Sequence, residues 1–171
     1  MSKRELKKYL HELNKEQLEE QINDLYSRFK EVKVFYDFVF NPKEDKLLDE
    51  CKFKISKEYF PINGRKAKMR RSIAQKYIKH FKQIGVEASI IADVMLYNIE
   101  IAQSYSQEKE IKQEAFYKSI LKSFEEACSF IYENDLSKVF MPRLKGVVDE
   151  AILQNWYNKG FFEKNLISSN I

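Results

Sequence analysis

The chain has 171 residues, of which 44% are hydrophobic, 33% charged and 14% aromatic, too rich in large apolar side chains for a disordered protein. The length predicts a single domain over residues 1–171 with its own core. The net charge is +4. The opening ten residues are too charged for a secretory signal, and the apolar runs are too short for a membrane span. We therefore expect a cytoplasmic protein, in which no disulfide is needed between Cys51 and Cys128.

Two side-chain capping patterns open the chain. Ser2 precedes Glu5 by three residues, and Asn14 precedes Gln17 in the same way, so helices are predicted to begin after Ser2 and after Asn14. The first predicted helix is short and covers residues 3–13.

Apolar residues then recur at spacings of four and three, which favours one continuous helix over residues 15–40. These positions are Leu18, Ile22, Leu25, Phe29, Val32, Tyr36 and Val39. The stripe either packs within its own chain or forms a seam between two copies. Because further apolar residues widen it toward the end, packing within a monomer is favoured and a homodimer is the alternative.

The middle of the chain is divided by its prolines and glycines. A helix is predicted to begin near Pro42 and to end before Pro61, because the residue before a proline is pushed out of helical geometry. The next predicted helix covers residues 68–84, and Gly85 suits its left-handed end. Residues 87–105 are apolar almost all the way round, so this segment is predicted to be the central buried helix.

Three further helical segments complete the predicted fold. One covers residues 111–132, one begins at Pro142 and runs through Trp156, and a short piece covers residues 161–167. The polar end, residues 168–171, is expected to fray. The sequence therefore predicts an all-α, antiparallel bundle of seven or eight helices around the central helix.

Several segments resemble a known family. The runs KYIKHFKQIGVEASIIADVMLYNIEIAQSY and QEAFYKSILKSFEEA, with SKRELKKYL and NPKEDKLL, are similar to a family of small bacterial proteins of unknown function. The resemblance covers nearly the whole chain and implies a bacterial origin and one helical domain. It implies no catalytic or binding residue, since the family has no assigned activity.

All of the excess positive charge lies in one segment. Residues 61–86 contain eight basic residues and no acid, and such a segment attracts phosphates, nucleic acid or an acidic protein surface. Its candidate binding residues are Arg65, Lys66, Lys68, Arg71, Lys79 and Lys82. The alternative is that these side chains are solvated or pair with acids of the second half, such as Glu125, Glu126 and Asp149. Binding to a membrane surface is disfavoured, because the apolar side of this helix is needed for the core.

The sequence contains little of the chemistry that an enzyme needs. It has two histidines, His11 and His80, without metal-binding spacing, and no phosphate-binding glycine motif, so neither a metal nor a cofactor is expected. The polar minority of the central helix is Asp93, Asn98 and Glu100. Both carboxylates either face a groove or pair with Lys or Arg of a neighbouring helix, and Asn98 needs hydrogen-bond partners if it is buried.

These observations favour a non-enzymatic cytoplasmic interaction module, whose candidate partners are an acidic protein or nucleic acid. Sequence-independent nucleic-acid binding through residues 65–82 is the alternative. A third hypothesis is an enzyme that works in a groove near Asp93 and Glu100.

Overall fold

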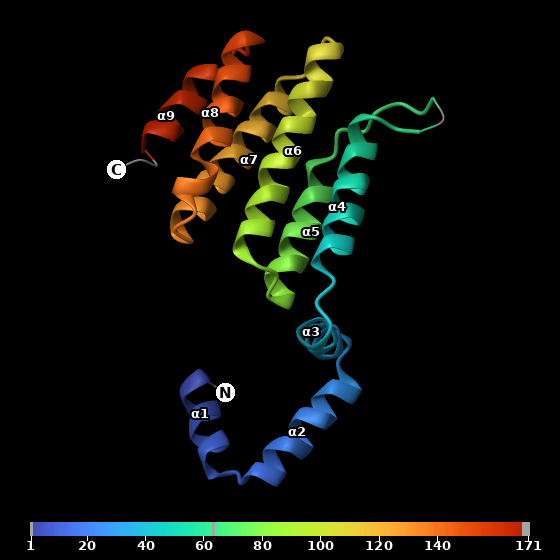
Figure 1. Ribbon diagram of the computed structural model, residues 1–171, viewed down its shortest axis with the longest axis vertical. Coiled ribbons are helices and arrows are strands. Elements are labelled where there is room, and N and C mark those ends of the chain that lie inside the picture. The colour runs from blue at the N-terminus through green and yellow to red at the C-terminus, as the bar shows by residue number, and fades with distance from the viewer. Residues whose placement is uncertain (1, 63, 169–171) are drawn as a thin grey trace. The chain divides into compact units, whose positions relative to one another are not determined.

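The structure is a computed structural model that describes residues 2–62 and 64–168 (Figure 1). Within these residues it contains nine α-helices and no strand, which confirms the all-α prediction. The helices are α1 (Lys3–Glu12), α2 (Lys15–Arg28), α3 (Lys30–Phe40), α4 (Glu44–Tyr59), α5 (Arg71–Ile84), α6 (Ala88–Glu108), α7 (Glu114–Glu133), α8 (Ser137–Leu153) and α9 (Lys159–Ser168). The sequence predicts fraying of residues 168–171, and residues 169–171 lie outside the described part of the chain.

The chain divides into two compact units, an N-terminal unit of residues 1–43 and a C-terminal unit of residues 44–171. The first contains α1 to α3 and the second contains α4 to α9. The expectation of one domain over the whole chain stays a prediction.

Local capping determines where α1 and α2 begin. The Ser2 hydroxyl accepts from the Glu5 backbone N–H at 3.3 Å, and the Asn14 side chain accepts from the Gln17 N–H at 2.8 Å. In both helices the side chain at the third position also accepts from the cap backbone, so both predicted capping boxes are confirmed.

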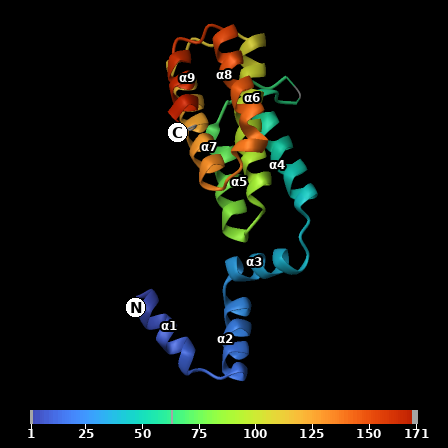
Figure 2. The same cartoon turned by 60° about the vertical axis from the view of Figure 1, so that its left-hand side comes forward.

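The prediction of one continuous helix over residues 15–40 is wrong. Phe29 is extended, with φ −114° and ψ 116°, and α3 leaves the line of α2 at this residue (Figure 2). The Tyr26 hydroxyl donates to Asp37 Oδ1 at 2.7 Å across the break. This bond favours the bent arrangement, because a straight helix would place residues 26 and 37 three turns apart.

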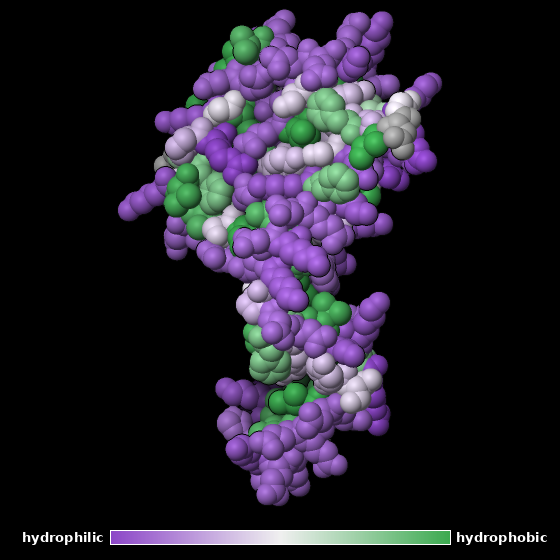
Figure 3. Space-filling model, turned by 45° about the vertical axis from the view of Figure 1, so that its right-hand side comes forward, coloured by the Kyte–Doolittle hydropathy of each residue, from purple (hydrophilic) through white to green (hydrophobic). Residues whose placement is uncertain are grey.

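The N-terminal unit has no buried residue among those described. Ile22, Leu25 and Phe29 of the heptad stripe are 43%, 42% and 51% exposed, so this unit does not cover the stripe by itself. Apolar side chains are accordingly visible on its surface (Figure 3). A homodimer seam along this stripe stays a prediction.

The core lies in the C-terminal unit, around α6. This helix packs against α4, α5, α7 and α8, and Figure 1 shows it between α4 and α5 on one side and α7 and α8 on the other. Nine of its residues are buried, including Leu96 and Ile99, so the prediction of a central apolar helix is confirmed. Phe124 of α7 and Phe162 of α9 pack against each other in the core, with ring centroids 5.1 Å apart.

The ends of two helices differ from the prediction. Helix α5 begins at Arg71 rather than residue 68, because Met69 has a left-handed φ of 50° that interrupts the helical path. Its end is as predicted, at Gly85 with φ 79°. Helix α8 begins at Ser137, so Pro142 lies inside it and does not begin it. The ring is exposed there, which lets the helix continue past a residue that lacks an N–H donor.

Candidate functional site

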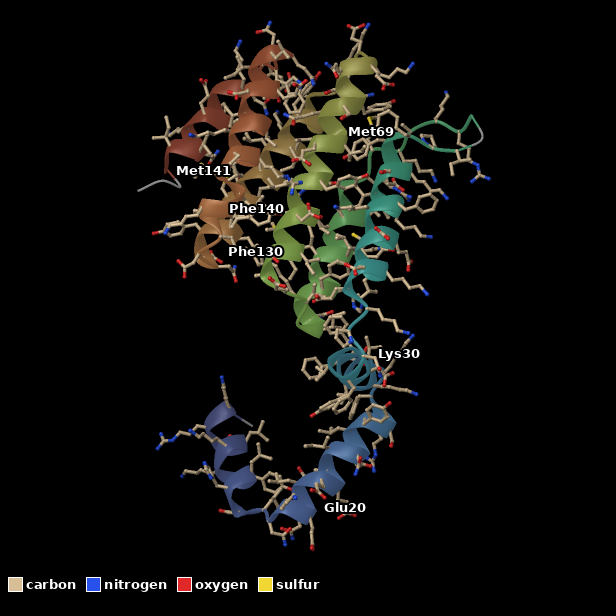
Figure 4. The ribbon with its side chains drawn as sticks, in the orientation of Figure 1. Glu20, Lys30, Met69, Phe130, Phe140 and Met141 are labelled. Carbon is tan, nitrogen blue, oxygen red and sulfur yellow. The ribbon has the colours of Figure 1, made fainter. Side chains whose placement is uncertain are left out.

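The segment that follows α4 folds back on Glu58. The backbone N–H groups of Lys68 and Met69 both donate to the Glu58 carbonyl oxygen at 2.9 Å. Figure 4 accordingly shows Met69 beside the C-terminal end of α4. Arg70 donates from Nε to Glu58 Oε2 and from Nη2 to Oε1, each at 2.8 Å. Glu58 therefore holds residues 68–70 in place through both its backbone carbonyl and its side chain.

The Glu58 side chain is only 12% exposed and remains a carboxylate. The hydrogen bond from Arg70 is the main reason that its pKa is lowered from the ordinary value, and it outweighs the opposing effect of burial. Sequence reasoning missed Glu58. An acid near the end of a helix is common, and only the folded loop brings it against the basic segment.

A hollow of about 410 Å³ opens beside this loop. We call it the basic hollow, and it is lined by Lys57, Glu58, Pro61, Ile62, Arg65, Lys66, Lys68 and Arg70. Five of these side chains are cationic, and one is acidic. Of the candidate binding residues, the structure brings together Arg65, Lys66 and Lys68, all of which are exposed.

The remaining candidate cations of the basic segment have other surroundings. Arg71 is 19% exposed, donates from Nε to Ser123 Oγ at 2.7 Å and pairs with Glu126 through Nη2. Lys82 Nζ lies 4.3 Å from the ring centroid of Phe130, and Lys79 is exposed on α5. Arg71 therefore joins α5 to α7, in agreement with the alternative that basic side chains pair with acids of the second half. Arg71, Lys79 and Lys82 do not line the basic hollow.

The two carboxylates of α6 lie in an ion-pair cluster, here called the Arg143 cluster. Arg143 donates from Nε and Nη2 to the two oxygens of Glu100, each at 2.8 Å, and from Nη1 to Asp93 Oδ1 at 2.6 Å. Lys52 Nζ lies 2.7 Å from Asp93 Oδ2. The cluster joins α4, α6 and α8, so both carboxylates pair with cations of neighbouring helices.

Burial by itself would raise the pKa of Asp93, but hydrogen bonds from Lys52 and Arg143 outweigh it and lower the pKa below the ordinary value. Hydrogen bonds from Arg143 to Glu100, the larger cause, and to Asp93 raise the pKa of Arg143 against the opposing effect of burial. Glu100 and Arg143 also line a second hollow, of about 450 Å³, between α6 and α8.

A family model matches residues 1–169, which is almost the entire chain. The chain belongs to DUF6155, a family of unknown function. The resemblance to a family of unknown function is thereby confirmed, and the bacterial origin that it implied stays a prediction. Comparison with curated proteins and with solved structures gives no match. DUF6155 carries no assigned activity, so its function has to be argued from the side chains.

The remaining candidates of the sequence have the following surroundings in the described part of this DUF6155 chain. No three His, Cys, Asp or Glu side chains there are grouped to hold a metal ion. Cys51 and Cys128 are buried and not joined by a disulfide, and burial raises the pKa of the Cys51 thiol to about 12. Asn98 is 3% exposed in the core. None of the described helices is long and apolar enough to cross a membrane.

Proposed function

We propose that this DUF6155 protein is a non-enzymatic, cytoplasmic interaction module that binds an acidic segment of a partner protein in the basic hollow. The observation that carries the proposal is the unbalanced charge of the hollow. Five cations line it, and both oxygens of its one acid, Glu58, already accept hydrogen bonds from Arg70. Such a surface attracts an acidic partner and raises its rate of association.

The Arg143 cluster supports a non-enzymatic reading. A general acid or base needs a pKa near the working pH, whereas the pKa of Asp93 is lowered. Both oxygens of Glu100 accept hydrogen bonds from Arg143. The hypothesis of an enzyme near these two residues therefore has less support than binding in the basic hollow.

Nucleic-acid binding through residues 65–82 is the alternative. This alternative requires several cations in a row along α5, each close enough to neutralise a phosphate of the nucleic-acid backbone. Arg71 pairs with Glu126 and Lys82 lies over Phe130, so α5 offers fewer unengaged cations than its sequence suggests. The concentration of charge in one hollow favours a compact acidic segment.

A binding experiment with matched charge reversals tests this proposal. The hollow variant carries Arg65→Glu, Lys66→Glu and Lys68→Glu. The control carries the same charge change at exposed lysines outside the hollow, with Lys76→Glu, Lys79→Glu and Lys138→Glu. Fluorescence anisotropy of a labelled hexaglutamate peptide and of a labelled 20-base-pair duplex measures the affinity at several salt concentrations.

We expect the hollow variant to bind the peptide about tenfold more weakly or worse, and the control to lose less than about threefold. Absence of peptide binding at 50 mM salt would contradict the proposal. Duplex binding that the control variant loses, with a log–log salt slope of about −0.9 per phosphate neutralised, would instead support nucleic-acid binding through α5.

A further inference from the structure

The pairing of Arg70 with Glu58 leaves one edge of the guanidinium group available. Arginine has five N–H donors. Glu58 accepts from Nε and from Nη2, which is the side-on arrangement of a bidentate pair. The two N–H groups of Nη1 and the second N–H of Nη2 are not used in this pair. One N–H of Nη1 and the second N–H of Nη2 form the end-on edge of the guanidinium plane, and this edge is itself a bidentate donor for a second oxyanion.

Arg70 is held in place before any ligand arrives. Its side chain is 50% exposed while that of Glu58 is 12% exposed, so the buried acid anchors an accessible cation. The backbone bonds from Lys68 and Met69 to the Glu58 carbonyl oxygen fix the segment that carries Arg70. A ligand that binds the end-on edge would therefore lose little free energy to ordering this side chain.

The charge around that edge exceeds what one carboxylate can neutralise. Lys57, Arg65, Lys66 and Lys68 line the same hollow, and Glu58 is its only acid, which leaves an excess of four positive charges among the lining residues. A carboxylate brings one negative charge and two oxygens. A phosphate monoester brings about −1.5 to −2 charges and three terminal oxygens, so two oxygens can face Arg70 while the third faces a lysine.

Apolar side chains border the same hollow. Ile62 lines it and is 52% exposed, and Lys57 Nζ lies 4.1 Å from the ring centroid of Phe53, which is 51% exposed. Ile62 is therefore an exposed apolar side chain in the lining of the hollow, and Phe53 is a second one next to its lining residue Lys57. A free phosphate would leave both uncovered, whereas residues beside a phosphorylated side chain would pack on them.

We propose that the basic hollow binds a phosphorylated serine or threonine in a segment of a partner protein, with the end-on edge of Arg70 as the central contact. This inference rests on the proposed function and names the chemistry of the acidic segment. Lys57, Arg65, Lys66 and Lys68 supply the surrounding charge, and Ile62 and Phe53 contact the residues next to the phosphate.

Three peptide libraries with the full-length protein test the inference. Each is a degenerate nonapeptide library with fluorescein at one end, and the libraries differ only at the central residue, which is phosphoserine, serine or glutamate. Anisotropy at 150 mM salt gives the affinity, and inorganic phosphate at millimolar concentration is added as a competitor. We expect the phosphoserine library to bind at least about tenfold more tightly than the other two.

Two variants and one control locate the binding. Arg70→Lys keeps the charge and removes the forked edge, so it should weaken binding of the phosphoserine library about tenfold. Lys66→Gln should weaken it severalfold, and Lys79→Gln, at an exposed cation outside the hollow, should leave it unchanged. Thermal unfolding of each variant shows whether it is folded. If Arg70→Lys does not fold, the result with Lys66→Gln still decides whether the ligand binds in the hollow.

The other outcomes are also informative. Equal binding of the glutamate and phosphoserine libraries would overturn the phosphate inference and leave the proposed function standing. Binding of inorganic phosphate with no preference for the phosphoserine library would indicate a small phosphorylated ligand and overturn the partner segment. No binding of any library, even at 50 mM salt, would overturn both.

Discussion

Arg143 connects two helices of the C-terminal unit through a single side chain. It donates from α8 to both oxygens of Glu100 and to Asp93, which lie two helical turns apart on α6. Its side chain is 33% exposed, so water screens part of the attraction between the charges. The cluster is therefore expected to contribute to stability by a moderate amount.

Replacing Arg143 by methionine tests that contribution, because methionine keeps much of the side-chain length and removes the charge. We expect the free energy of unfolding to fall by about 1–3 kcal/mol, since two carboxylates lose their charged hydrogen-bond donor. Urea denaturation at pH 7 measures it. Lys145→Met, at an exposed residue of the same helix, should change stability by less than about 0.5 kcal/mol. Equal effects of the two variants would contradict this role of Arg143.

Asp93 should make stability depend on pH. Its pKa is lower in the folded protein than the ordinary value of 3.8, so the folded state favours the ionised form. That stabilisation is fully present above the pKa of the unfolded chain and is lost as the pH falls through the folded value.

Asp93→Asn removes this titration. We expect the variant to be about 1 kcal/mol less stable than the natural protein near pH 6.5, with the difference shrinking below about pH 4. Urea denaturation at a series of pH values between 3 and 7 measures both proteins. A difference that grows on acidification would show that the sign is wrong.

At the scale of the helix, boundaries were predictable where a short-range rule decides them. Ser2 with Glu5 and Asn14 with Gln17 begin helices as predicted, and Gly85 ends one. Phe29 gave no such signal. An uninterrupted heptad pattern surrounds it, and the break depends on backbone geometry and on contacts between α2 and α3 that the pattern does not contain.

The candidate site was predictable in part, for a related reason. The distribution of charge along the chain revealed the basic segment, and Asp93 and Glu100 were recognisable as polar residues of an apolar helix. Their partners Lys52 and Arg143 lie on other helices, at separations of 41 and 43 residues, and only packing brings them together. The sequence offers several acids as partners for the basic segment, and in the folded protein Glu58 pairs with Arg70 and Glu126 pairs with Arg71.

Helix α8 contains two residues with low helix propensity. Pro142 lies in its interior and lacks an N–H donor, and a Cβ at Gly146 would meet nothing within 4 Å. We expect Pro142→Ala to raise the free energy of unfolding by about 1–2 kcal/mol and Gly146→Ala by about 0.5–1 kcal/mol. Urea denaturation measures both, and a loss of stability in Pro142→Ala would indicate that the proline is favourable at this position.

At the scale of the molecule, the two units differ in how they are stabilised. All of the described residues that are buried lie in the C-terminal unit, and none lies among residues 2–43. A unit of about 40 residues without a fully buried residue among those described is too small to be stable alone. The cooperative stability of the chain is therefore expected to belong to residues 44–171.

Two fragments test this division. Residues 41–171 should unfold cooperatively, with a melting temperature within about 5 °C of the full chain, because their core is complete. Residues 1–43 should show partial helicity and no cooperative transition. Circular dichroism on heating measures both fragments. A C-terminal fragment that has lost its cooperative transition would show that residues 1–43 contribute to its folding.

The anchoring of the loop by Glu58 also has a consequence for proteolysis. Trypsin cleaves after Lys and Arg, and this loop contains Arg65, Lys66, Lys68 and Arg70 in six residues. A protease binds about ten residues in an extended conformation in its cleft. The peptide bonds after Arg65 and Lys66 are exposed and can adopt this conformation more readily than the peptide bonds near Met69. The Met69 N–H donates to the Glu58 carbonyl oxygen, which holds that part of the loop in place. Brief digestion followed by mass spectrometry should therefore give first cuts after residues 65 and 66. Glu58→Ala removes the pairing with Arg70 and keeps the backbone carbonyl at position 58, so it should add a cut after residue 70 and leave residue 68 protected.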